Sequence, residues 1–158
     1  MRNKYNTSNL QISHLNFLDI KPFSRMRALQ ILANHPTQSS ITTIESDVQF
    51  FKRNKFYRES IVFYFIEITR ALCYSSRHKD AVALFEVYNN LYQGNIGFWA
   101  SIHRNTLHLY ASWAYAKNNS RENALIHYNL FNPSLIENFQ EECIKNDFTV
   151  VKKLLRRD

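Results

Sequence analysis

The chain has 158 residues, a net charge of +7 and a hydrophobic content of 45%. This length and hydrophobic content exclude a disordered protein and fit a single folded domain. Two glycines and three prolines are few for such a chain, so the sequence predicts an all-α fold without a sheet, built of long helices and short polar loops.

We predict that residues 1–23 form a segment that is poorly ordered or that docks on the rest of the chain. Residues 1–9 have no apolar period, and we expect them to fray. Lys21-Pro22 interrupts the short apolar stretch that follows them. We expect residues 24–158 to form one helical domain.

Two helices open this domain. Ser24 can cap the first helix, which ends at His35-Pro36 because the residue before a proline avoids the α region. A polar linker, Thr37–Ser40, then leads into a helix from about Thr42 to Arg53.

The stretch from Phe63 to Phe85 contains two helical patterns separated by a polar break at Ser75–His78. The first helix runs from about Tyr57 to Ser75 and is apolar nearly all round, so we expect it to be the central helix. A buried strand is the alternative for its six apolar residues 61–66, but the 3.6-residue period continues beyond them and favours a helix. The second helix runs from Lys79 to Tyr92.

The same arrangement recurs between Leu109 and Phe131. A long helix, Phe98–Lys117, has two apolar stripes, which indicates two neighbours. Asn118-Asn119-Ser120 separates it from a helix that ends at Asn132-Pro133-Ser134. Two short amphipathic helices then close the chain, Leu135–Lys145 and Asp147–Arg156.

In both units a small residue near the start of the second helix precedes an aromatic residue by four positions. Ala81 precedes Phe85, and Ala124 precedes Tyr128. The small residue lets two helices approach closely, and the aromatic ring fills the adjacent groove. This pattern resembles the tetratricopeptide repeat.

The resemblance covers about residues 42–133, with a weaker third unit in which Ser60 and Tyr64 take these positions. It implies an array of antiparallel helix hairpins, a TPR-like α-solenoid. Ala81 and Ala124 are 43 residues apart where the family has 34, and the first helices lack its Trp, Leu-Gly and Tyr set, so an unrelated helical bundle stays open. Residues 71–85 resemble the pentatricopeptide repeat, an RNA-reading relative, about as well.

Among tetratricopeptide-like proteins, single-domain chains of this length resemble the bacterial type III secretion chaperones. That resemblance implies a cytoplasmic protein that keeps hydrophobic secreted proteins soluble. Those chaperones are usually acidic, whereas this chain has a net charge of +7.

The sequence offers little chemistry. Two glycines leave no Gly-rich phosphate loop, and the six histidines show neither an HExxH motif nor a carboxylate at ligand spacing. The neighbouring Glu141 and Glu142 point in different directions on a helix. We therefore predict no enzyme, no catalytic residue, no cofactor and no metal.

Cysteine content and hydropathy favour a cytoplasmic protein. Cys73 and Cys143 lie inside helical patterns, which favours buried thiols in a reducing compartment over a disulfide. The longest apolar run is far shorter than the ~18 residues of a membrane span. Residues 1–44, which are rich in Lys/Arg and poor in acids, also fit a mitochondrial presequence.

The positive charge is concentrated in the first third of the chain. Residues 1–58 have nine Lys/Arg and three acids. Lys52, Arg53, Lys55 and Arg58 cluster next to Phe51, Phe56 and Tyr57, and a basic cluster interleaved with aromatic residues is the form that nucleic-acid contacts take. A solvated loop is the plainer interpretation of the same cluster.

We therefore expect a non-enzymatic adaptor or chaperone that holds a segment of an acidic or hydrophobic protein partner. The alternative is a nucleic-acid-binding regulator that uses the basic N-terminal third. Aromatic and arginine side chains dominate interface energetics, and we expect the partner to contact five of them on the long helix and the hairpin before it. These residues are Tyr64, Tyr88, Arg104, His108 and Tyr110.

Overall fold

The computed structural model describes residues 20–33, 37–53, 60–91, 98–135 and 142–156. Within these ranges the chain forms seven α-helices and no strand, which confirms the predicted all-α fold. The helices are α1 (Ile20–Ala33), α2 (Thr37–Arg53), α3 (Ser60–Tyr74), α4 (His78–Leu91), α5 (Phe98–Lys117), α6 (Arg121–Leu130) and α8 (Glu142–Arg156).

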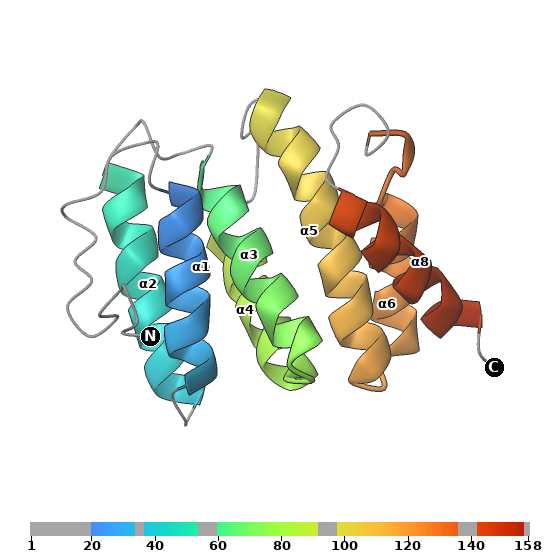
Figure 1. Ribbon diagram of the computed structural model, residues 1–158, viewed down its shortest axis with the longest axis horizontal. Coiled ribbons are helices and arrows are strands. Elements are labelled where there is room, and N and C mark those ends of the chain that lie inside the picture. The colour runs from blue at the N-terminus through green and yellow to red at the C-terminus, as the bar shows by residue number, and fades with distance from the viewer. Residues whose placement is uncertain (1–19, 34–36, 54–59, 92–97, 136–141, 157–158) are drawn as a thin grey trace, which may run out of the picture.

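Four helices, α1, α3, α5 and α8, follow one another from left to right across Figure 1, and α4 and α6 lie behind them. Helix α3 packs against α1, α4 and α5, and α5 packs against α3, α4, α6 and α8. Helices with neighbours on several sides must be apolar on more than one face. The central position predicted for α3 is thus confirmed, whereas α5 packs against four helices and not the two that its apolar stripes indicated.

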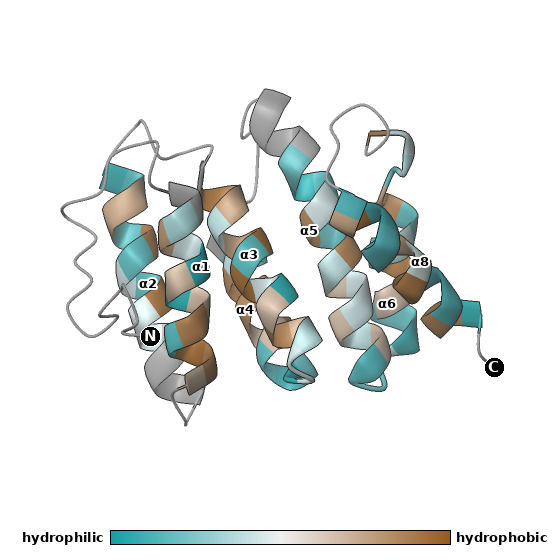
Figure 2. Cartoon of the chain, viewed as in Figure 1, coloured by the Kyte–Doolittle hydropathy of each residue, from teal (hydrophilic) through white to brown (hydrophobic). Residues whose placement is uncertain are grey.

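All seven helices contribute side chains to one core cluster. Figure 2 shows hydrophobic residues on α3 and on the part of α4 that is visible behind it, and hydrophilic residues at the turns below α3 and α5. Ala81 and Ala124 are fully buried, as expected for positions where two helices approach closely. The largest fully buried side chains are Tyr64, Tyr88, Tyr110, Phe51, Phe65, Ile44, Ile61, Ile68, Leu72, Leu84, Leu107 and Leu109.

Two short turns join α3 to α4 and α5 to α6, and they have the same conformation. Ser76 (φ 59°) and Asn119 (φ 58°) occupy the left-handed region, which a polar residue can adopt at the end of a helix. The next N–H closes each turn on a carbonyl five residues earlier: Arg77 on Leu72 and Ser120 on Tyr115, both at 2.9 Å. The two turns lie 43 residues apart.

Two predicted boundaries near the start of the chain are wrong. Lys21-Pro22 was expected to precede the first helix and Ser24 to cap it, but α1 begins at Ile20, so Pro22 lies in its first turn and Ser24 lies within the helix. A first-turn proline is tolerated since the N–H groups there lack an intrahelical acceptor anyway. Thr37–Ser40 is not a linker but the first turn of α2. Residues 1–19, most of the predicted docking segment, lie outside the described residues.

The predicted division of the C-terminal region is also wrong. A single helix, α8, runs from Glu142 to Arg156 through the expected break between Lys145 and Asp147. Its apolar positions then share one face, and Val151 and Leu155 are buried on it. Most of the other helix predicted there, residues 136–141, falls outside the described residues.

Candidate binding groove

An open pocket with a volume of about 500 Å³, hereafter the groove, lies between α2 and α4. Four of the five lining side chains from α2 are polar and lie at positions i, i+3, i+4 and i+7, which share one helix face. Donors and acceptors from hydroxyl and amide groups therefore stand beside the negative charge of Glu45. The lining residues are Thr42, Glu45, Ser46, Val48, Gln49, Val87 and Asn90.

The opposite face of α2 explains why this stripe points outward. Ile44 and Phe51 are buried on it and hold α2 against the core, and the buried Val48 lies between this face and the pocket that it lines. The ring of Phe51 packs edge-on against Phe23 of α1 and Tyr64 of α3, with centroid separations of 6.4 and 5.2 Å. The polar face is thus left to the pocket.

A buried ionic cluster fixes the same helix. Asp47 accepts hydrogen bonds from Arg27 through both carboxylate oxygens, at 2.7 Å to Nε and 3.0 Å to a terminal nitrogen. The Tyr64 hydroxyl donates a third hydrogen bond to Asp47. Burial raises the pKa of the Asp47 carboxyl, while the hydrogen bonds from Arg27 and Tyr64 lower it. Because Asp47 lies between the groove residues Ser46 and Val48, this cluster holds the groove wall against α1 and α3.

A second buried aspartate anchors α8 in a similar way. Asp147 is fully buried and accepts hydrogen bonds from the hydroxyls of Tyr74 and Tyr110. Arg70 pairs with it at 3.2 Å. Both carboxylate oxygens are engaged in joining α3, α5 and α8, so the geometry supports a structural role for Asp147.

The structure separates the five predicted partner contacts. Tyr64, Tyr88 and Tyr110 are buried, with at most 2% of their surface exposed. In this conformation the three tyrosines belong to the core and present no surface to a partner. Arg104 and His108 are half-buried.

Three of these five residues do lie together between α4 and α5. Arg104 donates from Nε to the Tyr88 hydroxyl at 3.0 Å, and its guanidinium lies 5.6 Å from the centre of the same ring. His108 continues this row toward the Phe85 ring, at a centroid separation of 6.2 Å. The hydroxyls of Tyr64 and Tyr110 instead donate hydrogen bonds to Asp47 and Asp147, respectively.

His108 of α5 also meets His127 of α6, a residue that the sequence did not single out. Their Nδ1 atoms are 3.0 Å apart. The ring centroids are 5.2 Å apart and the planes differ by 19°. The centroid distance exceeds the Nδ1 distance by roughly the two ring radii, so the rings meet edge to edge. This geometry suits one shared proton.

Part of the basic character of the N-terminal third is neutralised within the fold. Arg27 is bound to Asp47, and Arg25 pairs with Glu67 at 3.4 Å. Lys52 and Arg53 are exposed at the end of α2. The other two members of the predicted basic cluster, Lys55 and Arg58, lie outside the described residues.

The remaining candidate chemistry is sparse. Cys73 and Cys143 are both thiols, and burial raises the pKa of Cys73. In the part of the chain that the structure describes, three or more His, Cys, Asp or Glu residues nowhere gather around a possible metal position. Among these same residues, the helices are too short or too polar to cross a membrane. Comparisons with protein-family models, curated proteins and solved structures find no match.

The groove residues of α2 were missed although the sequence contained a signal for them. Within the predicted helix 42–53, Thr42, Glu45, Ser46 and Gln49 form a polar stripe without a long side chain of positive charge. Asp47 interrupts the opposite, apolar face, and a carboxylate in such a position indicates a buried partner. The sequence could not show that the partner of Asp47 is Arg27, because Arg27 lies on another helix.

Proposed function

We propose that this chain is a non-enzymatic adaptor or chaperone that holds a segment of another protein in the groove between α2 and α4. The pocket volume of about 500 Å³ and its polar wall support this proposal most directly. An extended peptide offers backbone N–H and C=O groups. The side-chain amides of Gln49 and Asn90 can both donate to and accept from such groups.

The rigidity of the groove wall favours binding. Asp47, Arg27 and Tyr64 hold α2 from behind, so the polar stripe keeps its spacing whether or not a partner is present. A preorganised site avoids the entropic cost of ordering side chains on association.

The proposal includes a TPR-like array of helix hairpins. The two turns at Ser76 and Asn119 have matching φ angles 43 residues apart, and the buried Ala81 and Ala124 follow them at equal distances. These observations support two copies of one unit, α3–α4 and α5–α6.

A chaperone for hydrophobic clients, such as a type III secretion chaperone, is the more specific form of the proposal. Three large apolar side chains on α6 support it. Leu125, Ile126 and Leu130 are exposed over 37%, 48% and 56% of their surface. Exposed apolar side chains grouped on one helix are typical of interaction surfaces.

The alternative, a nucleic-acid-binding regulator, rests on the exposed Lys52 and Arg53 beside the groove. The pairing of Arg25 and Arg27 with acids reduces the charge available for it. Nucleic acid bound by such residues is released steeply as salt rises, so the absorbance ratio of the purified protein at low and high salt distinguishes this alternative.

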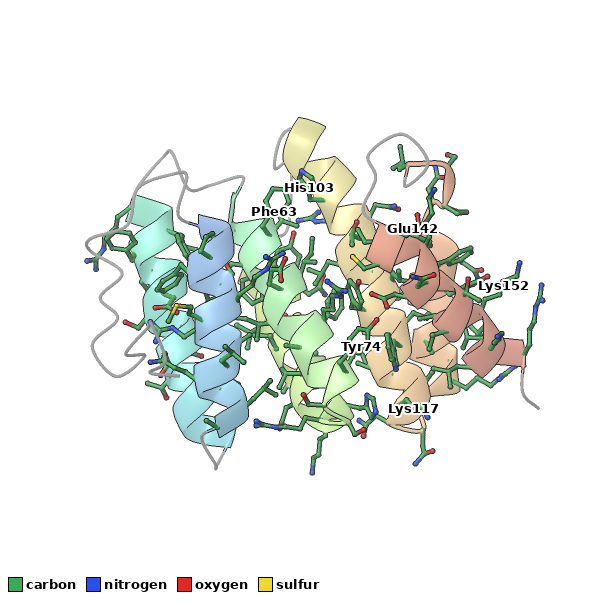
Figure 3. The ribbon with its side chains drawn as sticks, viewed as in Figure 1. Phe63, Tyr74, His103, Lys117, Glu142 and Lys152 are labelled. Carbon is green, nitrogen blue, oxygen red and sulfur yellow. The ribbon has the colours of Figure 1, made fainter. Side chains whose placement is uncertain are left out.

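Photocrosslinking in the native host tests the adaptor proposal. A photoreactive amino acid replaces Gln49 in the groove, and the control places the same group at Glu142, whose side chain is 80% exposed at the start of α8 (Figure 3). We expect a discrete polypeptide adduct from position 49 and none from position 142. The proposal is contradicted if position 49 gives no adduct, or if nuclease treatment removes the adduct.

A further inference from the structure

We propose that the contact between α5 and α6 is an acid-sensitive latch, in which His108 and His127 share one proton at neutral pH and separate when both imidazoles are protonated. This inference concerns how the fold responds to acid and is independent of the partner that the groove takes.

The latch begins with the edge-to-edge geometry of the two rings. With their Nδ1 atoms 3.0 Å apart, one imidazole donates its Nδ1–H and the other accepts through a bare Nδ1. The lone pairs of two metal ligands would have to converge on a third point, whereas these two nitrogens face each other. A hydrogen bond therefore accounts for the contact without a metal.

Proton balance explains the acid sensitivity. The first added proton can bind Nε2 of the donor ring, which leaves the shared N–H between the rings. The second proton has to occupy the bare Nδ1 of the acceptor ring. It then meets the N–H already there, breaks the hydrogen bond and places two positive charges at contact distance.

The surroundings disfavour the charged forms. Tyr115 stacks on His127 at a centroid separation of 5.4 Å, and Phe85 contacts the same ring edge-on at 4.6 Å. Burial lowers the pKa of both histidines; for His108 the nearby His127 and Arg104 add to this effect and bring its pKa to about 4. The neutral pair is therefore the form present at pH 7.

The other ionisable groups near the pair are themselves bound. On α4, the Glu86 carboxylate accepts a hydrogen bond from the Tyr115 hydroxyl at 3.2 Å. Also on α4, the Tyr88 hydroxyl accepts from Arg104. On α6, Arg121 donates to the carbonyl of Leu155 at the end of α8.

The acids of α6 and α8 in the described residues are Glu122, Glu142 and Asp147. Glu122 is exposed in the first turn of α6. The Asp147 carboxylate of α8 is engaged by Tyr74, Tyr110 and Arg70.

The sign of the pH effect follows from the lowered pKa values. An unfolded histidine titrates near 6.5, so below that pH the unfolded chain binds more protons than the folded one. The stabilisation is complete above about pH 6.5 and is lost as the pH falls toward 4.

Chemical denaturation at pH 7.5 and pH 5.0 tests the latch. From His108 alone we expect the unfolding equilibrium constant to increase about 30-fold between these pH values. His108→Gln should remove most of this increase, and His127→Gln should reduce it, because the burial of His108 remains in that variant. The matched control is His103→Gln, on the same helix but packed on Phe63 at a centroid separation of 3.9 Å, as Figure 3 shows; it should keep the increase.

The proposal is overturned if His108→Gln shows the same acid dependence as the parent. An NMR titration of the parent provides a second test that needs no variant. The His108 imidazole should titrate well below pH 6.5, and a midpoint at 6.5 would overturn the latch. At pH 5.0, hydrogen exchange corrected for its intrinsic rate should quicken at α6 before α3, and equal protection of the two helices would also contradict it.

Discussion

Asp147→Ala should destabilise the protein strongly, although Asp147 lies on the last helix of the chain. The carboxylate is fully buried and joins α8 to α3 and α5 through Tyr74, Tyr110 and Arg70. Removing it leaves these donors without their acceptor. We expect the free energy of unfolding to fall by about 2–4 kcal/mol.

How much each of the three donors contributes to this loss of stability depends on how exposed its side chain is. The buried Tyr110 hydroxyl loses its partner, which costs about 1–3 kcal/mol. Tyr74 is 56% exposed, so water can replace most of its hydrogen bond. The Arg70 side chain is 25% exposed and can turn toward solvent, so the loss stays below the ~3–5 kcal/mol of a fully buried broken ion pair.

Urea denaturation followed by circular dichroism measures the change. The matched control is Glu142→Ala, which removes a carboxylate from the same helix where the side chain is 80% exposed and only 4.0 Å from Lys145. It should cost at most about 1 kcal/mol. The reasoning is refuted if Asp147→Ala costs no more than this control.

A double-mutant cycle with Tyr110→Phe separates the hydrogen bond from the cavity. The tyrosine change should be costly when Asp147 is present and nearly neutral when it is absent, with a coupling of at least about 1 kcal/mol. Additive effects would show that Tyr110 and Asp147 do not act together.

Three further results are expected. Ala81→Leu and Ala124→Leu should each destabilise by about 1–3 kcal/mol, because both positions are fully buried and extra methylenes overpack the contact; unchanged melting of both variants would contradict the paired helices. An aromatic disulfide reagent should modify the half-buried Cys143 before Cys73, whose thiol pKa is raised by burial; equal rates would contradict this difference. Circular dichroism should show helix without sheet, and a strand content above roughly a fifth would be incompatible with the all-α fold.

Local patterns in the sequence predicted the positions of most helices. The apolar periods of α4, α5 and α6 lie in the expected ranges, and the polar breaks that contain Ser76 and Asn119 became the two turns. The errors arose where a rule for one residue type was applied without regard to the position of that residue in its helix. Lys21-Pro22 was expected to separate the N-terminal segment from the first helix, yet Pro22 lies in the first turn of α1, where it costs no hydrogen bond.

The buried polar clusters could not be read from local patterns. Tyr64 and Tyr110 have the aromatic character of interface residues, but their hydroxyls reach Asp47 and Asp147 on other helices. Such pairings join residues 17 and 37 positions apart and depend on how helices are placed in space. His127 was passed over for the same reason, since its partner lies on α5.

Direct binding tests the central claim, that the groove between α2 and α4 holds a protein segment. Peptides selected from a random display library against the parent protein serve as the probe. We expect the Gln49→Ala/Asn90→Ala double variant to bind them about tenfold more weakly or worse, since two hydrogen-bonding groups of the groove are removed. The matched control, Asn129→Ala/Asn146→Ala, removes two exposed amides outside the groove and should bind like the parent. Equal affinity of the groove variant and the parent would contradict the account.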